Sequence, residues 1–144
     1  SRAGAMTVGL ACNSGSELGA AADYAVEVDV GPEVLAGSTR LKAGSATKQV
    51  LNMISTGVMV RLGKTYRNLM VDVTVSNAKL RDRAERLVAA ITGMGGAEVS
   101  NALDQSGQRV PVAVLMLQLC LDRGHAEQAL ADAGGVLRQA LRDT

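Results

Sequence analysis

Aromatic side chains are almost absent from this sequence. Its 144 residues include two tyrosines and no phenylalanine or tryptophan, so the core must consist of Val, Leu, Ile, Ala and Met. Base-stacking platforms and aromatic-anchored interfaces both need rings. The formal net charge of +1 also provides no basic field for nucleic acid. We therefore expect no nucleic-acid partner.

Histidine and cysteine are scarce as well. The single histidine is His125, and the two cysteines, Cys12 and Cys120, lie far apart in apolar runs. This set predicts no metal site. The cysteines are predicted to be buried free thiols, which favours a reducing, cytoplasmic location. No histidine is near Cys12 in the sequence, so a nucleophilic role is not favoured, and His125 is predicted to be an exposed or capping residue.

Long hydrophobic runs are also missing. The sequence shows no signal peptide, and the apolar run "VPVAVLMLQLCL" is shorter than the roughly 20 residues that cross a bilayer. We expect a buried helix there and no membrane partner.

The first 30 residues predict a strand, a short helix and a second strand. The strands are expected at Thr7–Cys12 and Tyr24–Val30, with Ser16 capping the helix between them. Two parallel strands do not make a stable sheet. We expect the sheet to be completed by a missing N-terminal half or by another chain.

Helices dominate the remainder of the chain. A helix from Leu41 to Leu62 is apolar nearly all round, which predicts a core helix ended by Gly63. "TYRNLMVDV" is expected to be extended. Another helix should run from a cap at Ser76 or Asn77 to about Ile91. After the glycine-rich "TGMGG", short helices are predicted at 97–105, 110–121, 125–133 and from 136 onward.

The loop "GPEVLAGSTRLKAGSATK" follows the second strand and precedes the long helix, where ligands bind in open α/β sheets. It offers hydroxyls, cations, close-approach glycines and a helix N-terminus that favours anions. Glu33 is its one carboxylate and a candidate acid, base or sugar-hydroxyl acceptor. The other interpretation is that Ser38 or Thr39 caps the helix and that the loop's cations are solvated.

Several longer motifs carry a family resemblance. They are "TVGLACN-GS", "GPEV", "GSTR-KAG", "LNM-STG-M-R-GK", "NLMVDV" and "NAKL--RA". The chain resembles the N-acetylmuramic acid 6-phosphate etherases of the sugar isomerase (SIS) superfamily, strongly from Met6 to Ala84 and more loosely after Gly96. The resemblance implies an α/β fold in which residues 1–92 are the C-terminal half of a flavodoxin-like SIS domain. Residues 97–144 would be a small UBA-like helical bundle.

The resemblance also implies a reaction. These lyases cleave the D-lactyl ether of N-acetylmuramic acid 6-phosphate in peptidoglycan recycling, giving N-acetylglucosamine 6-phosphate and D-lactate without metal or organic cofactor. Their catalytic glutamate pair is expected upstream of this chain, so no catalytic residue is assigned to it and the chain alone is expected to be inactive. The alternative is a non-catalytic phosphosugar sensor related to the glucokinase regulatory protein.

The resemblance places the loop beside the sugar site. The substrate-binding candidates are Glu33, Ser38, Thr39, Arg40 and Lys42. The expected partner is a phosphorylated amino sugar, with a homo-oligomer, a homodimer in this family, or the missing N-terminal half as the protein partner.

Overall fold

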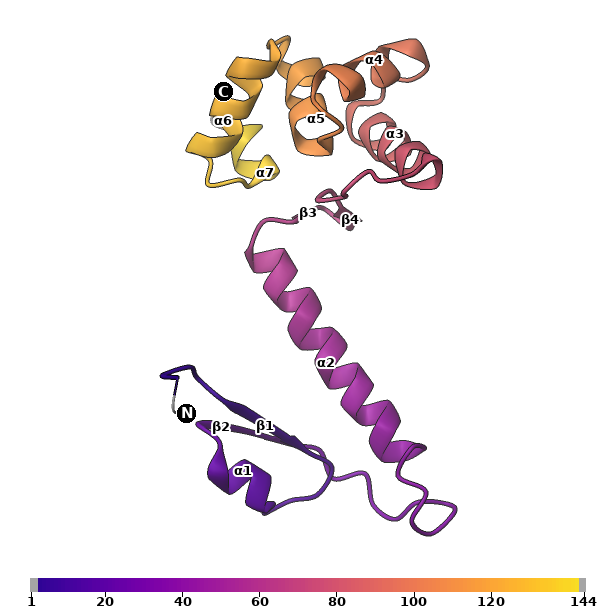
Figure 1. The fold of residues 1–144 in the computed structure, drawn as a ribbon, viewed down its shortest axis with the longest axis vertical. Helices are drawn as coiled ribbons and strands as arrows, with labels where there is room; N and C mark the ends of the chain where they lie inside the picture. The colour runs from indigo at the N-terminus through magenta and orange to yellow at the C-terminus, as the bar shows by residue number, and fades with distance from the viewer. Residues whose placement is uncertain (1–2, 143–144) are drawn as a thin grey trace. The chain divides into compact units, whose positions relative to one another are not determined.

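The computed structural model describes residues 3–142, which form two compact units (Figure 1). The first unit runs to Gly57, and the second begins at Val58. Each unit has its own arrangement of elements.

The first unit contains the predicted parallel strand pair. Strand β1 (Val8–Ala11) pairs with β2 (Tyr24–Glu27), and Val8 lies opposite Tyr24. Helix α1 (Glu17–Ala21) connects the strands and packs against both of them (Figure 1). The Ser16 hydroxyl accepts a hydrogen bond from the Gly19 amide at 2.9 Å, which confirms the predicted cap.

Helix α2 (Lys42–Arg61) has nearly the predicted bounds. It ends in a left-handed glycine, Gly63, with a φ of 71°. The Gly63 amide donates to the Val60 carbonyl and the Lys64 amide to the Met59 carbonyl. This is the Schellman arrangement that satisfies the last carbonyls of a helix. A Cβ at Gly63 would lie 2.6 Å from a methyl of Val136, so glycine is required here for space as well as for conformation.

The prediction that α2 is a core helix is wrong for this chain. None of its residues is buried, and Met53 and Ile54 are 65% and 45% exposed. A helix that is apolar all round needs neighbours on every side. Among residues 3–142, nothing covers these side chains.

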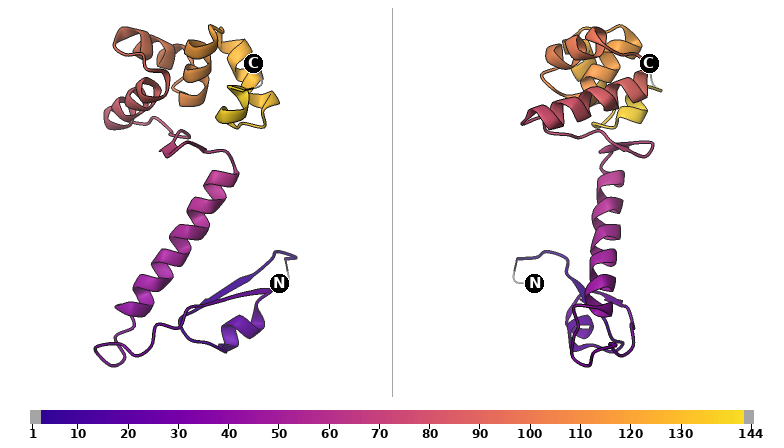
Figure 2. Two further views of the ribbon diagram at one scale, coloured as in Figure 1. Left: turned by 180° about the vertical axis from the view of Figure 1, so that it is seen from behind. Right: turned by 90° about the vertical axis from the view of Figure 1, so that its right-hand side faces the viewer.

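In the second unit, a hairpin follows the end of α2. Strands β3 (Thr65–Tyr66) and β4 (Leu69–Met70) pair antiparallel where an extended segment was expected. Helix α3 (Ala78–Thr92) follows, with the Asn77 side chain accepting from the Leu80 amide at its start. The remaining helices are α4 (Ala97–Gln105), α5 (Val110–Leu119), α6 (Arg123–Asp132) and α7 (Leu137–Ala140) (Figure 2).

The core of the second unit is built around α5. Val110 and residues 112–115 have no exposed surface, which confirms the predicted buried helix. Helices α3, α4 and α6 all pack against α5, and α3 contributes Ala84, Leu87 and Val88. Helix α3 therefore packs with the helices beyond the glycine-rich break. The division at 92–97 and the UBA-like character of residues 97–144 stay predictions.

Both cysteines are free thiols, as predicted, but neither is buried. Cys12 is half-buried, and Cys120 is exposed in a left-handed conformation at the end of α5. An apolar run indicates that a helix is buried, but it does not show on which residue the chain leaves the core.

Across residues 3–142, no helix has both the length and the apolar character needed to cross a membrane.

A matched pair of substitutions tests the difference between α5 and α2. Leu115→Ala should lower the free energy of unfolding by about 2–5 kcal/mol, because it opens a cavity in a closed core. Ile54→Ala should change it by less than about 1 kcal/mol, because Ile54 is already exposed to water. Urea unfolding followed by circular dichroism at two protein concentrations measures both. An equal loss for Ile54→Ala would contradict the exposed position of α2.

Candidate functional site

The Glu33 carboxylate holds the start of α2. One oxygen accepts from the Lys42 amide at 2.9 Å and the other from the Ala43 amide at 3.0 Å. The side chain comes from nine residues upstream, across the loop. Because a helix N-terminus carries a partial positive charge, a carboxylate is a favourable cap there. The interpretation that a Ser38 or Thr39 side chain caps this helix is therefore wrong.

The next amides of α2 are also used within the loop. The Gly44 amide donates to the Thr39 carbonyl at 2.8 Å, and the Ser45 amide donates to the Leu41 carbonyl at 3.1 Å. With Lys42 and Ala43 bound to Glu33, none of these four amides is left for a phosphate. The expected anion site at this N-terminus is occupied by the chain's own carboxylate, so any anion contact must come from side chains.

Hydrogen bonding fixes the charge state of Glu33. The bond from the Ala43 amide, and then that from the Lys42 amide, hold the pKa of Glu33 below its ordinary value. The group is therefore ionised at neutral pH. An ionised carboxylate with both oxygens engaged is a poor general acid, so the structure gives Glu33 a positioning role. Its contact with a sugar stays a prediction.

The two cationic candidates, Arg40 and Lys42, differ in their partners. Lys42 donates from Nζ to the Val30 carbonyl at 3.2 Å, just beyond β2. Arg40 is exposed and makes no hydrogen bond or ion pair within residues 3–142. All N–H donors of the Arg40 guanidinium are therefore available to a ligand. Lys42 would have to break its hydrogen bond to the Val30 carbonyl before its amine could bind one.

The two hydroxyl candidates lie between these cations and Glu33. Ser38 is half-buried and Thr39 is exposed. Their main-chain carbonyls accept from the Leu41 and Gly44 amides, which fixes the backbone of the loop. In the described part of the chain their hydroxyls have no partner, so both remain available as donors and acceptors.

Cys12 brings the other strand-to-helix turn to the same place. Its Sγ lies 3.4 Å from both the Ala43 carbonyl and the Thr47 hydroxyl, which ties the carboxyl end of β1 to the first turns of α2. The loop and the turn "NSGS" therefore share one sheet edge.

Glu27 was not among the candidates chosen from the sequence, although its side chain holds the turn that follows β1. Its carboxylate accepts from the Gly15 amide, the Ser16 amide and the Ser16 hydroxyl, each at 2.8 Å. The Ser16 amide, then the Gly15 amide, lower the pKa of Glu27. A Cβ at Gly19 would lie 2.5 Å from this carboxylate, so glycine leaves room for it. The acidic residue ending "YAVE" and the Ser-Gly turn are the signals that could have identified it.

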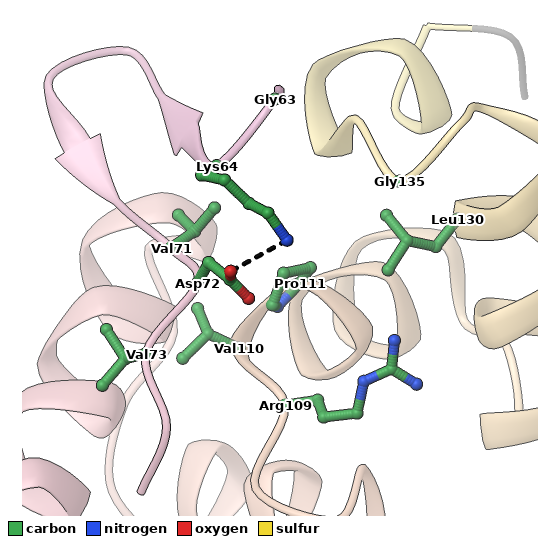
Figure 3. A pocket seen from close by; sticks show the side chains of 10 residues that line it. All are labelled: Gly63, Lys64, Val71, Asp72, Val73, Arg109, Val110, Pro111, Leu130 and Gly135. Carbon is green, nitrogen blue, oxygen red and sulfur yellow. Dashed lines mark ion pairs between the residues drawn. The ribbon is translucent and has the colours of Figure 1, made fainter. Parts of the chain in front are cut away.

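A partly enclosed pocket of about 140 Å³ lies in the second unit (Figure 3). Valines line much of it, and the Lys64–Asp72 ion pair crosses one side at 2.8 Å (Figure 3). Arg109, also in the lining, is paired with Glu127. The charged residues that line this pocket are thus neutralised by other residues of the protein. The pocket is therefore a weaker candidate for a ligand site than the loop that follows β2.

Metal-binding groups do not gather within residues 3–142, where no three His, Cys, Asp or Glu side chains come together. His125 is exposed and bonded to Asp122, the cap of α6, which confirms its predicted character.

Comparison with known proteins identifies the relatives of the chain. No family model matches it. A protein of Rubrobacter xylanophilus named N-acetylmuramic acid 6-phosphate etherase is 59% identical over 138 residues, which are 96% of this chain and 45% of that protein. The Streptomyces coelicolor protein of the same name is 54% identical over 138 residues, covering 96% and 44%. An etherase 1 of Bacillus licheniformis is 47% identical over 140 residues, covering 97% and 46%.

The chain is a relative of the N-acetylmuramic acid 6-phosphate etherases. This confirms the family resemblance predicted from the motifs. The chain spans about half the length of the curated etherases that it matches. The loop and both strands lie within the etherase-like part, because the matches cover nearly the whole chain.

The pH dependence of the α2 start tests the role of Glu33. Its pKa is lowered on folding, so its contribution is fully present above the ordinary glutamate pKa of about 4.3 and is lost as pH falls through the folded value. The amide proton shifts of Lys42 and Ala43 should titrate together in this acidic range. Glu33→Gln should remove that titration, whereas Glu17→Gln, a matched change on α1, should preserve it. If the Lys42 and Ala43 amide shifts still titrated in Glu33→Gln, that result would contradict the capping role of Glu33.

Proposed function

We propose that the complete protein containing these residues is a carbon–oxygen lyase that cleaves the D-lactyl ether of N-acetylmuramic acid 6-phosphate. The products would be N-acetylglucosamine 6-phosphate and D-lactate, in peptidoglycan recycling. The observation that carries the proposal is the 59% identity to an etherase over 96% of the chain. The parallel strands with a polar loop at their carboxyl ends support it, because that is where α/β sheets bind ligands.

Within this protein, the chain would supply one wall of the phosphosugar site. Arg40 would contact the phosphate, since its guanidinium is exposed and has no partner within residues 3–142. Ser38 and Thr39 would bond to sugar hydroxyls or phosphate oxygens. Lys42 would add charge close by, and Glu33 would hold the loop that presents the other four.

The proton transfers of the reaction would be carried out by groups outside this chain. Glu33 and Glu27 are both held ionised by main-chain amides, and neither is a proton donor near neutral pH. This supports the prediction that the catalytic glutamates lie elsewhere in the complete enzyme. A flavodoxin-like SIS domain, a cytoplasmic location and a homodimer are parts of the same proposal.

Arginine and lysine substitutions in the complete protein test the phosphate contact. Arg40→Gln should raise the KM for N-acetylmuramic acid 6-phosphate about tenfold, the effect of one charge-assisted hydrogen bond. Lys42→Gln should have a smaller effect, because its amine is already bonded to Val30. Lys79→Gln on α3 makes the same charge change and should have none. D-lactate release measures all three.

Two outcomes would separate the parts of this proposal. If Arg40→Gln and Lys79→Gln had the same KM and kcat, Arg40 would not contact the substrate, although the proposed reaction would still stand. No D-lactate from the complete wild-type protein would overturn the activity itself. The 144-residue chain alone is expected to release none, and turnover by it would place the catalytic groups within these residues.

A further inference from the structure

A second concave surface lies in the second unit, and it is formed by other residues than the loop. It is an open pocket of about 350 Å³, shaped by the β3–β4 hairpin, the end of α5 and the chain around α7. Its lining residues are Tyr66, Arg67, Gln118, Arg138, Leu141 and Arg142. We call it the three-arginine pocket.

No carboxylate within residues 3–142 forms an ion pair with the charges of this pocket. None of the lining residues is acidic, and none of the three arginines forms an ion pair within residues 3–142. Four other arginines of the same unit are each paired with a carboxylate: Arg81, Arg86, Arg109 and Arg123. Three guanidinium groups are thus concentrated on one hollow of a chain whose net charge is only +1.

The framework beneath the arginines is ordered by packing. Tyr66 packs against the hydrophobic core, and the Arg67 guanidinium lies 5.5 Å from the centre of its ring. Leu137 and Ala140 bury the inner side of α7, which leaves Arg138 exposed. Arg138 lies on α7 and Arg142 lies in the turn just beyond its end, and both line the pocket. The Gln118 amide nitrogen donates to the Ile91 carbonyl at 3.2 Å, which fixes the third side.

We propose that the three-arginine pocket binds a phosphate monoester of a small polar molecule. A phosphate monoester carries nearly two negative charges at neutral pH and three strong acceptor oxygens. Guanidinium groups match such oxygens with two parallel hydrogen bonds, and three of them suit a dianion better than a single carboxylate. The Tyr66 ring and Leu141 provide an apolar wall for the organic part. The volume is within the range of small-molecule sites.

The proposal does not rest on the etherase reaction. It concerns binding by residues of the second unit alone, and the loop residues Arg40 and Lys42 take no part in it. The chain offers a direct signal for it, because it has two tyrosines and no tryptophan. Tyr24→Phe leaves Tyr66 as the single tyrosine, so its emission reports on the pocket.

The experiment titrates the 144-residue Tyr24→Phe chain with N-acetylglucosamine 6-phosphate and, separately, with inorganic phosphate and N-acetylglucosamine. The ester should change Tyr66 emission saturably, with a Kd on the order of 0.1–1 mM for exposed charge pairs. Inorganic phosphate should bind more weakly because it lacks the organic part, and the uncharged sugar should not bind. Phosphorus-31 line broadening gives a second readout that is independent of the ring.

Substitutions then locate the binding. Arg67→Gln and Arg138→Gln should each raise the Kd for the ester about five- to tenfold. The double variant should show no binding of the ester. Arg83→Gln on α3 is a matched loss of an exposed arginine and should change nothing. Circular dichroism confirms that each variant is folded.

Several results would show that the three-arginine pocket does not bind a phosphate monoester. No saturable response in either readout, an equal loss in Arg83→Gln, or equal affinity for inorganic phosphate and the ester would each overturn the proposal.

Discussion

The carboxylate of Glu33 at the start of α2 is the contact on which the arrangement of the first unit depends. It joins a loop that follows β2 to two amides of a helix nine residues later. The loop between them is thereby closed, and its backbone is fixed further by main-chain bonds at Ser38 and Thr39. The contact also occupies the one position at which α2 would attract an anion. The side chains of Ser38, Thr39 and Arg40 are left for recognition.

Charged groups have different tasks in the two units. In the first, carboxylates bind main-chain amides: Asp23 accepts from Thr7, Glu27 from Ser16 and Glu33 from Lys42. Each has a lowered pKa for that reason, with a backbone hydrogen bond as the largest cause. In the second, several carboxylates bind arginines, as Asp104 does with Arg81, while Asp122 caps α6 through the His125 amide. These acids therefore support the structure, and the unpaired arginines are the groups that remain for ligands.

Local patterns predicted most of the elements. The caps Ser16 and Asn77, the glycine that ends α2 and the apolar stripe of α5 each depend on neighbours within a few residues, so they can be read directly from the sequence. The burial of α2 could not be predicted in the same way. Its apolar surface indicates that something covers it, but the pattern does not show whether the cover lies within this chain.

The site was predicted less well than the fold, for a related reason. The sequence placed Glu33 correctly in a polar loop before a helix, but its partners are determined by how the loop closes. Glu27 was missed because it acts on a turn 11 residues upstream, through a strand pairing that brings the two together. The difference between Arg40 and Lys42 depends on a carbonyl at Val30 that no motif indicates.

The pH profile of D-lactate release by the complete protein carrying Glu33→Gln tests the central claim most directly. If Glu33 positions the loop and transfers no proton, kcat/KM should fall at every pH while the profile keeps both of its limbs and their midpoints. Disappearance of one limb in Glu33→Gln, with the fold intact, would show that Glu33 is an acid or base of the reaction and would contradict the account.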